Sequence, residues 1–140
     1  MTLVKIVILV FIGLELTNVT ALYFAPGSKM ANAVGVFKAW EKSKEYPEIH
    51  DFVKYLVNWV AGAKLIFLLL LAVIVIYADI DTQRMSIIAL SIATTSFYWR
   101  LFPLIKKMDK AGQIDPPKYS TILGVMIFIF IAVFLAAFLI

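Results

Sequence analysis

Four long apolar stretches, separated by more polar segments, follow one another along the chain. They cover about residues 3–25, 52–78, 85–105 and 119–140. Each meets the roughly 20 residues that an α-helix needs to cross a hydrocarbon core of about 30 Å. Helices are the expected form, because backbone polar groups in lipid must be satisfied within the segment and strand-like alternation is absent. The pattern predicts an all-α integral membrane protein, in which residues 1–140 form one four-transmembrane-helix bundle.

The polar segment between the first two stretches, here called loop one, has a pattern of its own. Lysine and glutamate side chains take much of its surface, while apolar residues recur at helical spacing. This combination predicts an interfacial amphipathic helix over about residues 29–44, lying on the membrane surface. The apolar positions of that helix are Met30, Ala33, Val34, Phe37 and Trp40.

The second and third stretches are separated by only a few residues. Residues 79–84 form a tight turn, which predicts that these two helices make an antiparallel hairpin. Pro103 lies near the end of the third stretch, where its missing N–H predicts a kink. The fourth stretch is almost wholly apolar and only Gly124 breaks it. We expect this fourth helix to pack on the outside of the bundle or to contact another subunit.

Composition agrees with a membrane chain and removes several kinds of chemistry. Hydrophobic residues make up 63% of the 140 residues and charged residues 16%, against about 25% charged in a typical soluble domain. There is no cysteine and a single histidine, His50. Thiol chemistry, thiolate metal sites and a multi-histidine metal site within one chain are therefore excluded. We expect no cofactor, and no catalytic or metal-binding residue is predicted.

The net charge of +4 is distributed unevenly along the chain. Ten Lys and Arg residues lie in or beside loop one and the segment between the third and fourth stretches, here called loop three, whereas the opposite side has only Lys5 and Arg84. Cytoplasmic loops carry such an excess of basic residues. We therefore expect loops one and three in the cytoplasm, both termini outside and no nucleic-acid partner. Three basic residues near loop three are expected to contact lipid headgroups: Arg100, Lys106 and Lys107.

Two charged residues, Glu15 and Lys64, fall deep inside apolar stretches. At 1.5 Å per residue, each lies roughly 15 Å from the cytoplasmic end of its helix. An isolated charge at that depth is costly, so equal depth on sequential antiparallel helices favours an ion pair. Uncharged polar residues extend this pair into a predicted polar seam through the first three helices, serving as an ion-pair network or a transport site: Asn18, Asn58, Thr94 and Thr95.

The sequence Gly13-Leu14-Glu15-Leu16-Thr17 is similar to the first helix of the small multidrug resistance transporters, which carries a glutamate within the membrane. The resemblance is confined to this helix and implies a proton-carrying carboxylate at Glu15. The long basic loop one and Lys64 depart from that family's pattern. In size and helix count the chain also resembles the DoxX-like group of small four-helix membrane proteins.

Three hypotheses for function follow from these features. The first is a non-catalytic accessory or scaffold component, which associates with other membrane subunits as a homo- or hetero-oligomer through the apolar fourth helix. The second is a small homo-oligomeric transporter, coupled to protons or cations through Glu15. The third is an enzyme acting on lipid at the cytoplasmic face, for which the acid–base candidates are His50, Glu48 and Asp51.

Overall fold

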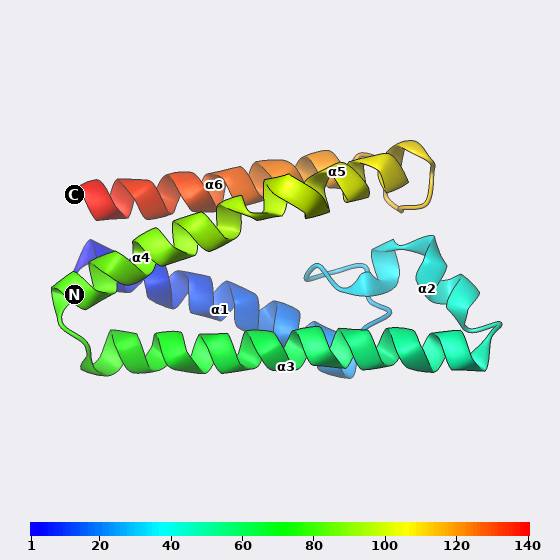
Figure 1. Cartoon of the computed structure of the whole chain (residues 1–140), viewed down its shortest axis with the longest axis horizontal. Coiled ribbons are helices and arrows are strands. Elements are labelled where there is room, and N and C mark those ends of the chain that lie inside the picture. The colour runs from blue at the N-terminus through cyan, green and yellow to red at the C-terminus, as the bar shows by residue number, and fades with distance from the viewer.

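The computed structural model describes residues 1–140 and is all-helical, without strands. Four helical segments are long and apolar enough to cross a membrane, and they coincide with the four predicted stretches. In chain order the elements are α1 (Leu3–Phe24), the short 3-10 helix η1 (Val34–Val36), α2 (Lys38–Ser43), α3 (Pro47–Tyr77), α4 (Ile80–Thr95), α5 (Phe97–Lys110) and α6 (Tyr119–Leu139) (Figure 1).

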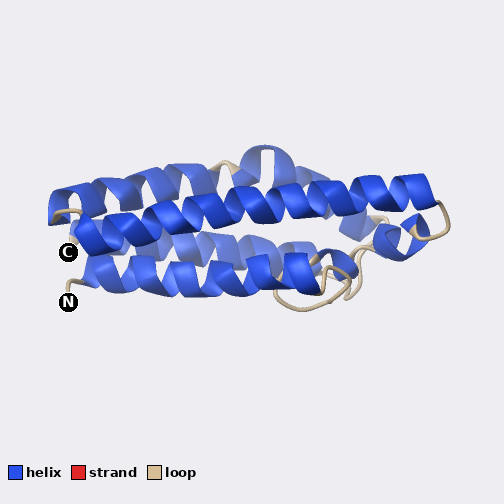
Figure 2. Ribbon diagram, turned by 90° about the horizontal axis from the view of Figure 1, so that it is seen from below, coloured by secondary structure: helices blue, strands red, loops and turns tan.

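The helices lie side by side along one long axis (Figures 1 and 2). Both termini and the α3–α4 turn lie at one end of the molecule, while loops one and three lie at the other end. α1 packs along α3 and also touches α4 and α6, and α6 packs along α4 and α5. The main core is formed where these helices meet, by fully buried side chains such as Ile8, Leu68, Ile87 and Phe134.

Local sequence signals explain where the helices begin. The Thr2 hydroxyl accepts a hydrogen bond from the Lys5 N–H at 3.3 Å, which caps α1. The Asp79 carboxylate caps α4 by accepting the Thr82 N–H at 2.7 Å. Pro47 stands in the first turn of α3, where its missing N–H costs no helical hydrogen bond. These ends are therefore predictable from residues within one turn.

The hairpin of α3 and α4 is present, but its two helices diverge from the turn onward (Figure 1). Each packs instead on a different partner, α3 on α1 and α4 on α6. This divergence leaves the space between α3 and α4 unfilled along part of their length, and it positions the candidate site described below.

The third apolar segment is interrupted at Ser96, earlier in the chain than the kink expected at Pro103. Pro103 itself lies inside α5 and does not end that helix. The Thr95 hydroxyl donates a hydrogen bond to the Ser91 carbonyl at 2.7 Å, and the Ser96 hydroxyl donates one to the Ala93 carbonyl at 2.6 Å. Hydroxyl groups that bond back to the preceding turn compete with the helical ladder and bend helices.

The amphipathic helix expected over residues 29–44 is not continuous, and this prediction is wrong in extent. Only Lys38–Ser43 is α-helical, with η1 before it. Ala31 and Asn32 both have φ of +53°, which a right-handed helix excludes. Gly35 packs directly on backbone atoms of Gly27 and Ser28, a contact that bends loop one back on itself. Loop one is therefore a folded cap with a short helix.

Loop one is held in place by loop three, a contact that joins distant parts of the sequence. Phe37 and Ile114 form an isolated antiparallel bridge. Its hydrogen bonds run from the Lys38 N–H to the Gln113 carbonyl and from the Asp115 N–H to the Val36 carbonyl, each 2.9 Å long. Buried Val36, Ile105 and Ile114 pack together beneath this bridge. Of the apolar residues expected to face lipid, Ala33 and Trp40 are buried against protein, whereas Met30 is exposed.

Candidate functional site

Glu15 and Lys64 lie in direct contact midway along the bundle. The Lys64 ammonium donates hydrogen bonds to the Glu15 carboxylate at 2.6 Å and to the Asn18 side-chain carbonyl at 2.6 Å. Glu15 and Asn18 are three residues apart on α1, which places them on the same helix face, toward α3. The side chains of Glu15 and Lys64 are 22% and 36% exposed, so the pair borders an opening and is not sealed in the core.

Asn18 extends this contact to loop one. Its side-chain amide donates to the carbonyls of Ala31 at 2.6 Å and Asn32 at 3.1 Å. Asn18 itself is buried, so each of its polar groups needs such a partner. The three side chains therefore join α3, α1 and loop one in one hydrogen-bonded chain, which we call the Lys64 relay (Lys64, Glu15 and Asn18).

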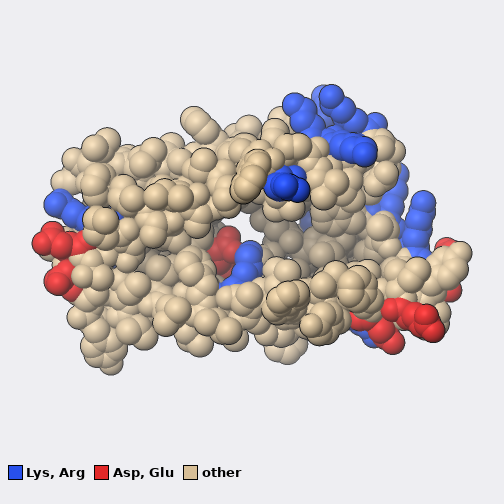
Figure 3. Space-filling model, in the orientation of Figure 1, with Lys and Arg blue, Asp and Glu red and all other residues tan.

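A hollow of about 320 Å³ lies beside this relay. Figure 3 shows acidic and basic atoms beside an opening midway along the molecule, between α3 and the α4–α5 segment. Glu15, Lys64, Thr94 and Ser96 are its polar lining residues. The remaining walls are apolar and come from five helices, α1, α3, α4, α5 and α6. They include Phe11, Phe67, Phe97, Leu101, Ile127 and Phe130.

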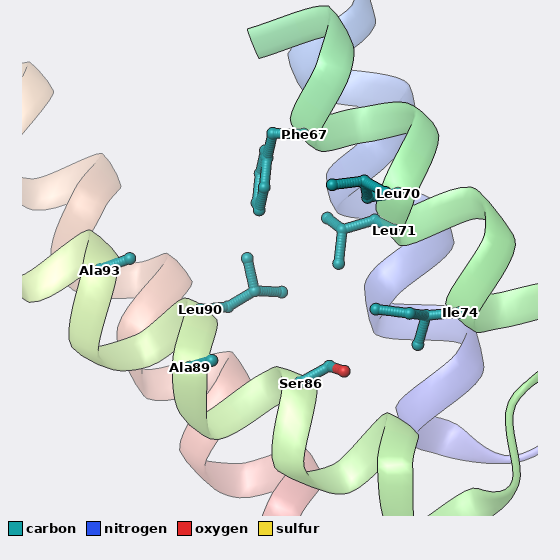
Figure 4. A pocket seen from close by; sticks show the side chains of 8 residues that line it. All are labelled: Phe67, Leu70, Leu71, Ile74, Ser86, Ala89, Leu90 and Ala93. Carbon is teal, nitrogen blue, oxygen red and sulfur yellow. The ribbon is translucent and has the colours of Figure 1, made fainter. Parts of the chain in front are cut away.

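The hollow continues into an apolar cleft between α3 and α4, with a volume of about 300 Å³ (Figure 4). Phe67, Leu90 and Ala93 line both spaces. The α4 wall presents mostly small side chains, whereas the α3 wall presents large ones (Figure 4). The cleft residues are Phe67, Leu70, Leu71 and Ile74 from α3, and Ser86, Ala89, Leu90 and Ala93 from α4.

Two residues of the predicted seam lie elsewhere. Asn58 is exposed and makes no side-chain hydrogen bond within the chain. At 100° per residue, six positions turn it about 120° away from Lys64, onto another face of α3. Thr95 is also exposed and bonds only its own helix, through the Ser91 carbonyl. The structure therefore does not bring Asn58 and Thr95 to the Lys64 relay, whereas Thr94, one position before Thr95, lines the hollow.

The three acid–base candidates at the start of α3 contact separate partners. His50 Nδ1 lies 2.8 Å from the Ser43 hydroxyl, and its ring packs 4.9 Å from the Trp40 ring, centroid to centroid. Asp51 pairs with Lys54 at 2.7 Å, and Glu48 is exposed. His50 thus fixes the α2–α3 corner, and the three side chains form no common site.

The basic residues expected at lipid headgroups lie on α5, near loop three. Arg100 stacks over the Trp99 ring and Lys106 over the Phe102 ring, each at 5.6 Å from the ring centroid. Lys107 is exposed nearby. Figure 3 shows basic atoms gathered over α5 and the loop that follows it. The three therefore belong to one charged end of the bundle.

Ser96 lines the hollow but was not among the predicted residues. The sequence signal for Ser96 was its place in the run Thr94-Thr95-Ser96, three successive hydroxyl residues at the point where α4 ends. Comparison with known proteins brings no further assignment: no protein-family model, no curated protein and no solved structure matches this chain.

Proposed function

We propose that this chain is an integral membrane protein whose four apolar helical segments span the bilayer. Large apolar side chains are exposed along all four segments, as a lipid-facing surface requires, and basic residues gather at the end formed by loops one and three. Cytoplasmic loops carry such charge, so loops one and three face the cytoplasm and both termini face outward. The chain is a multi-pass protein in this placement.

The function that the geometry supports best is that of a non-catalytic accessory component, which holds a transmembrane helix of another membrane protein. The observation that carries this proposal is the cleft between α3 and α4, which no residue of the chain fills. Ala89 and Ala93 lie one turn apart on its α4 wall, with Ser86 one turn before Ala89. Small residues at this spacing let another helix approach closely in a membrane.

The cleft replaces the fourth helix as the proposed site of subunit contact. α6 already packs along α4 and α5, with Phe134 and Ala137 buried and Gly124 against Phe102. The facing sides of α3 and α4 have no such partner near Ala89. A hetero-oligomer formed through this cleft would cover apolar surface that the isolated chain leaves open.

The Lys64 relay supports a structural role in such a component. Lys64, Glu15 and Asn18 bond to one another, and Asn18 also bonds loop one, so these polar groups find partners within the chain. A satisfied network of this kind fixes one arrangement of its helices, although buried ion pairs often add little net stability. Here it keeps α1 on α3, so that α3 remains separate from α4.

Site-specific photo-crosslinking tests the proposed helix contact. A photoreactive residue at Ala89 should cross-link to another membrane protein in native membranes. The matched control is Ile92 on the same helix, which is 69% exposed and does not line the cleft. Protein cross-links from Ala89 that are absent from Ile92 support the proposal. Equal cross-linking from both positions, or lipid adducts alone at Ala89, would overturn it.

The hollow beside the relay favours a second candidate, a small transporter for protons or cations. The Glu15 carboxylate, its ion-pair partner Lys64 and hydroxyls at Thr94 and Ser96 line the same space, where a proton or cation would compete with Lys64 for the carboxylate. Purified protein in liposomes should then carry a proton or cation flux that Glu15→Gln abolishes and Asn58→Leu, on an exposed face, leaves intact. Absence of flux in the unmodified protein would exclude this function.

A further inference from the structure

A second charged pocket lies at the cytoplasmic end of the bundle, apart from the hollow. It has a volume of about 270 Å³ and lies where α5 ends and α6 begins. Its lining carries three lysines, Lys106, Lys110 and Lys118, and the hydroxyl residues Ser120 and Thr121. Of the three basic residues expected at lipid headgroups, only Lys106 belongs to it. Lys110 and Lys118 were not singled out by the sequence.

Asp109 fixes the shape of this pocket. One of its carboxylate oxygens accepts the Lys118 N–H at 3.0 Å. The other accepts the Ser120 N–H at 2.9 Å and the Ser120 hydroxyl at 2.6 Å. These bonds tie the start of α6 to the last turn of α5. The backbone positions of all three lysines are thereby held around one space.

The charge balance of the pocket favours an anion. Asp109 is its only carboxylate, and that group is occupied by the start of α6. None of the three lysines forms an ion pair with a carboxylate of the chain, since the four ion pairs present involve Lys29, Lys44, Lys54 and Lys64. The Thr121 hydroxyl makes no hydrogen bond within the chain and remains a free donor. Three ammonium groups and a hydroxyl match the oxygens of a phosphate.

The surroundings of the pocket identify the source of that phosphate. Further along α6 from Thr121, Val125 and Phe128 lie on the same helix face and are 55% and 65% exposed. An acyl chain can lie along this apolar face while its headgroup fills the pocket. We propose that Lys106, Lys110, Lys118 and Thr121 bind the phosphate group of an anionic membrane lipid. This inference rests on the membrane placement proposed above, and loops one and three then lie at the headgroup level.

The test uses full-length protein in nanodiscs and in detergent, with native mass spectrometry to count bound lipid. Phosphatidylglycerol should bind the protein at least about tenfold more tightly than phosphatidylcholine, as expected for several lysines acting together. The triple variant Lys106→Gln/Lys110→Gln/Lys118→Gln should lose that preference. The matched control removes the same charge from the same end outside the pocket, by Lys38→Gln/Lys42→Gln/Lys44→Gln, and should keep it.

Three outcomes would overturn the inference. One is an equal loss in the pocket and control variants, which would mean diffuse charge and no defined site. Another is an absence of preference between the two lipids. The third is displacement of phosphatidylglycerol by inorganic phosphate at equal concentration, which would make a soluble phosphate the occupant. A protein that fails to insert into nanodiscs contradicts the proposed membrane placement, whereas an inserted protein without lipid preference contradicts this inference alone.

Discussion

Lys64 on α3 donates two hydrogen bonds to α1 at mid-bundle, one to Glu15 and one to Asn18. A charge at this depth is costly when it is alone, so each member of the pair reduces the cost of the other. Both side chains border the hollow and are partly exposed, which reduces their coupling below that of a sealed pair. Asn18 adds an uncharged partner, so Lys64 has a second hydrogen bond that does not depend on Glu15.

A double-mutant cycle measures this coupling. Glu15→Gln and Lys64→Met should each cost about 1–2 kcal/mol, below the roughly 3–5 kcal/mol that breaking a fully buried pair costs. The double variant should cost less than the sum of the two, because it leaves no unpaired charge. Thermal unfolding in detergent gives the three values. Strict additivity would show that the two charges do not stabilise each other.

Asp115 lies in loop three, outside the four long apolar segments, and its ionised carboxylate pairs with Lys29 of loop one. The Lys29 ammonium, which donates a hydrogen bond to this carboxylate and adds its positive charge, lowers the pKa of Asp115 below its ordinary value. Because folding lowers this pKa, the stabilisation that ionised Asp115 provides is complete above its unfolded pKa of about 3.9. That stabilisation is lost as the pH falls through the pKa of Asp115 in the folded protein. The contact between loops one and three should therefore weaken only in acid.

Hydrogen exchange at the Lys38 and Asp115 amides, which bridge the two loops, checks this expectation. Relative to the unmodified protein, Asp115→Asn should lower their protection factors at pH 6, since it removes the charged partner of Lys29. The difference between the two proteins should shrink only below about pH 4, as Asp115 becomes protonated. A difference that persists unchanged to pH 2 would contradict the assignment to ionised Asp115.

At the scale of the elements, two glycines differ in what an added side chain would contact: Gly13 within α1 and Gly35 in loop one. Gly13 lies within α1, and a methyl group added there would meet nothing within 4 Å. At Gly35, by contrast, an added Cβ would lie 2.0 Å from the Gly27 carbonyl oxygen and 2.6 Å from that of Ser28. These neighbours are backbone atoms, so they cannot move aside as a side chain does. Loop one must open to admit the change.

The variants Gly13→Ala and Gly35→Ala should therefore have opposite effects on stability. Gly13→Ala should be neutral or stabilise by up to about 1 kcal/mol, because alanine loses less conformational freedom in a helix. Gly35→Ala should destabilise by about 1–3 kcal/mol through overpacking. Unfolding midpoints in the same detergent compare the two. A tolerated Gly35→Ala would indicate that loop one is not packed as described.

At the scale of the whole molecule, most Lys and Arg residues lie at one of its two ends. Loops one and three form one basic end, where the bridge between Phe37 and Ile114 joins them. The termini and the α3–α4 turn form the other end. In the membrane placement proposed above, four crossing segments return the chain to the side on which it began, so both termini share one end. The positive-inside rule then selects one of the two orientations.

Cysteine accessibility tests the orientation, since the chain has no cysteine of its own. Single variants Thr2→Cys, Asp81→Cys and Lys42→Cys place a thiol at an exposed position at each end. A membrane-impermeant maleimide should label Thr2→Cys and Asp81→Cys in intact cells, and Lys42→Cys only after permeabilisation. The reverse pattern would show that the molecule lies the other way round in the membrane.

The sequence by itself determined the four apolar helices and the matching positions of Glu15 and Lys64 along α1 and α3. Helical hydrogen bonds and turn-scale periodicity are local, so residues within a few turns are sufficient to predict them. Tertiary structure decided the rest: the path of loop one through Gly35 and loop three, the turning of Asn58 away from Lys64, and the cleft between α3 and α4. These features depend on contacts between residues far apart in sequence, such as Phe37 with Ile114. Local sequence patterns cannot predict such contacts, because they describe only residues within a few turns of one another.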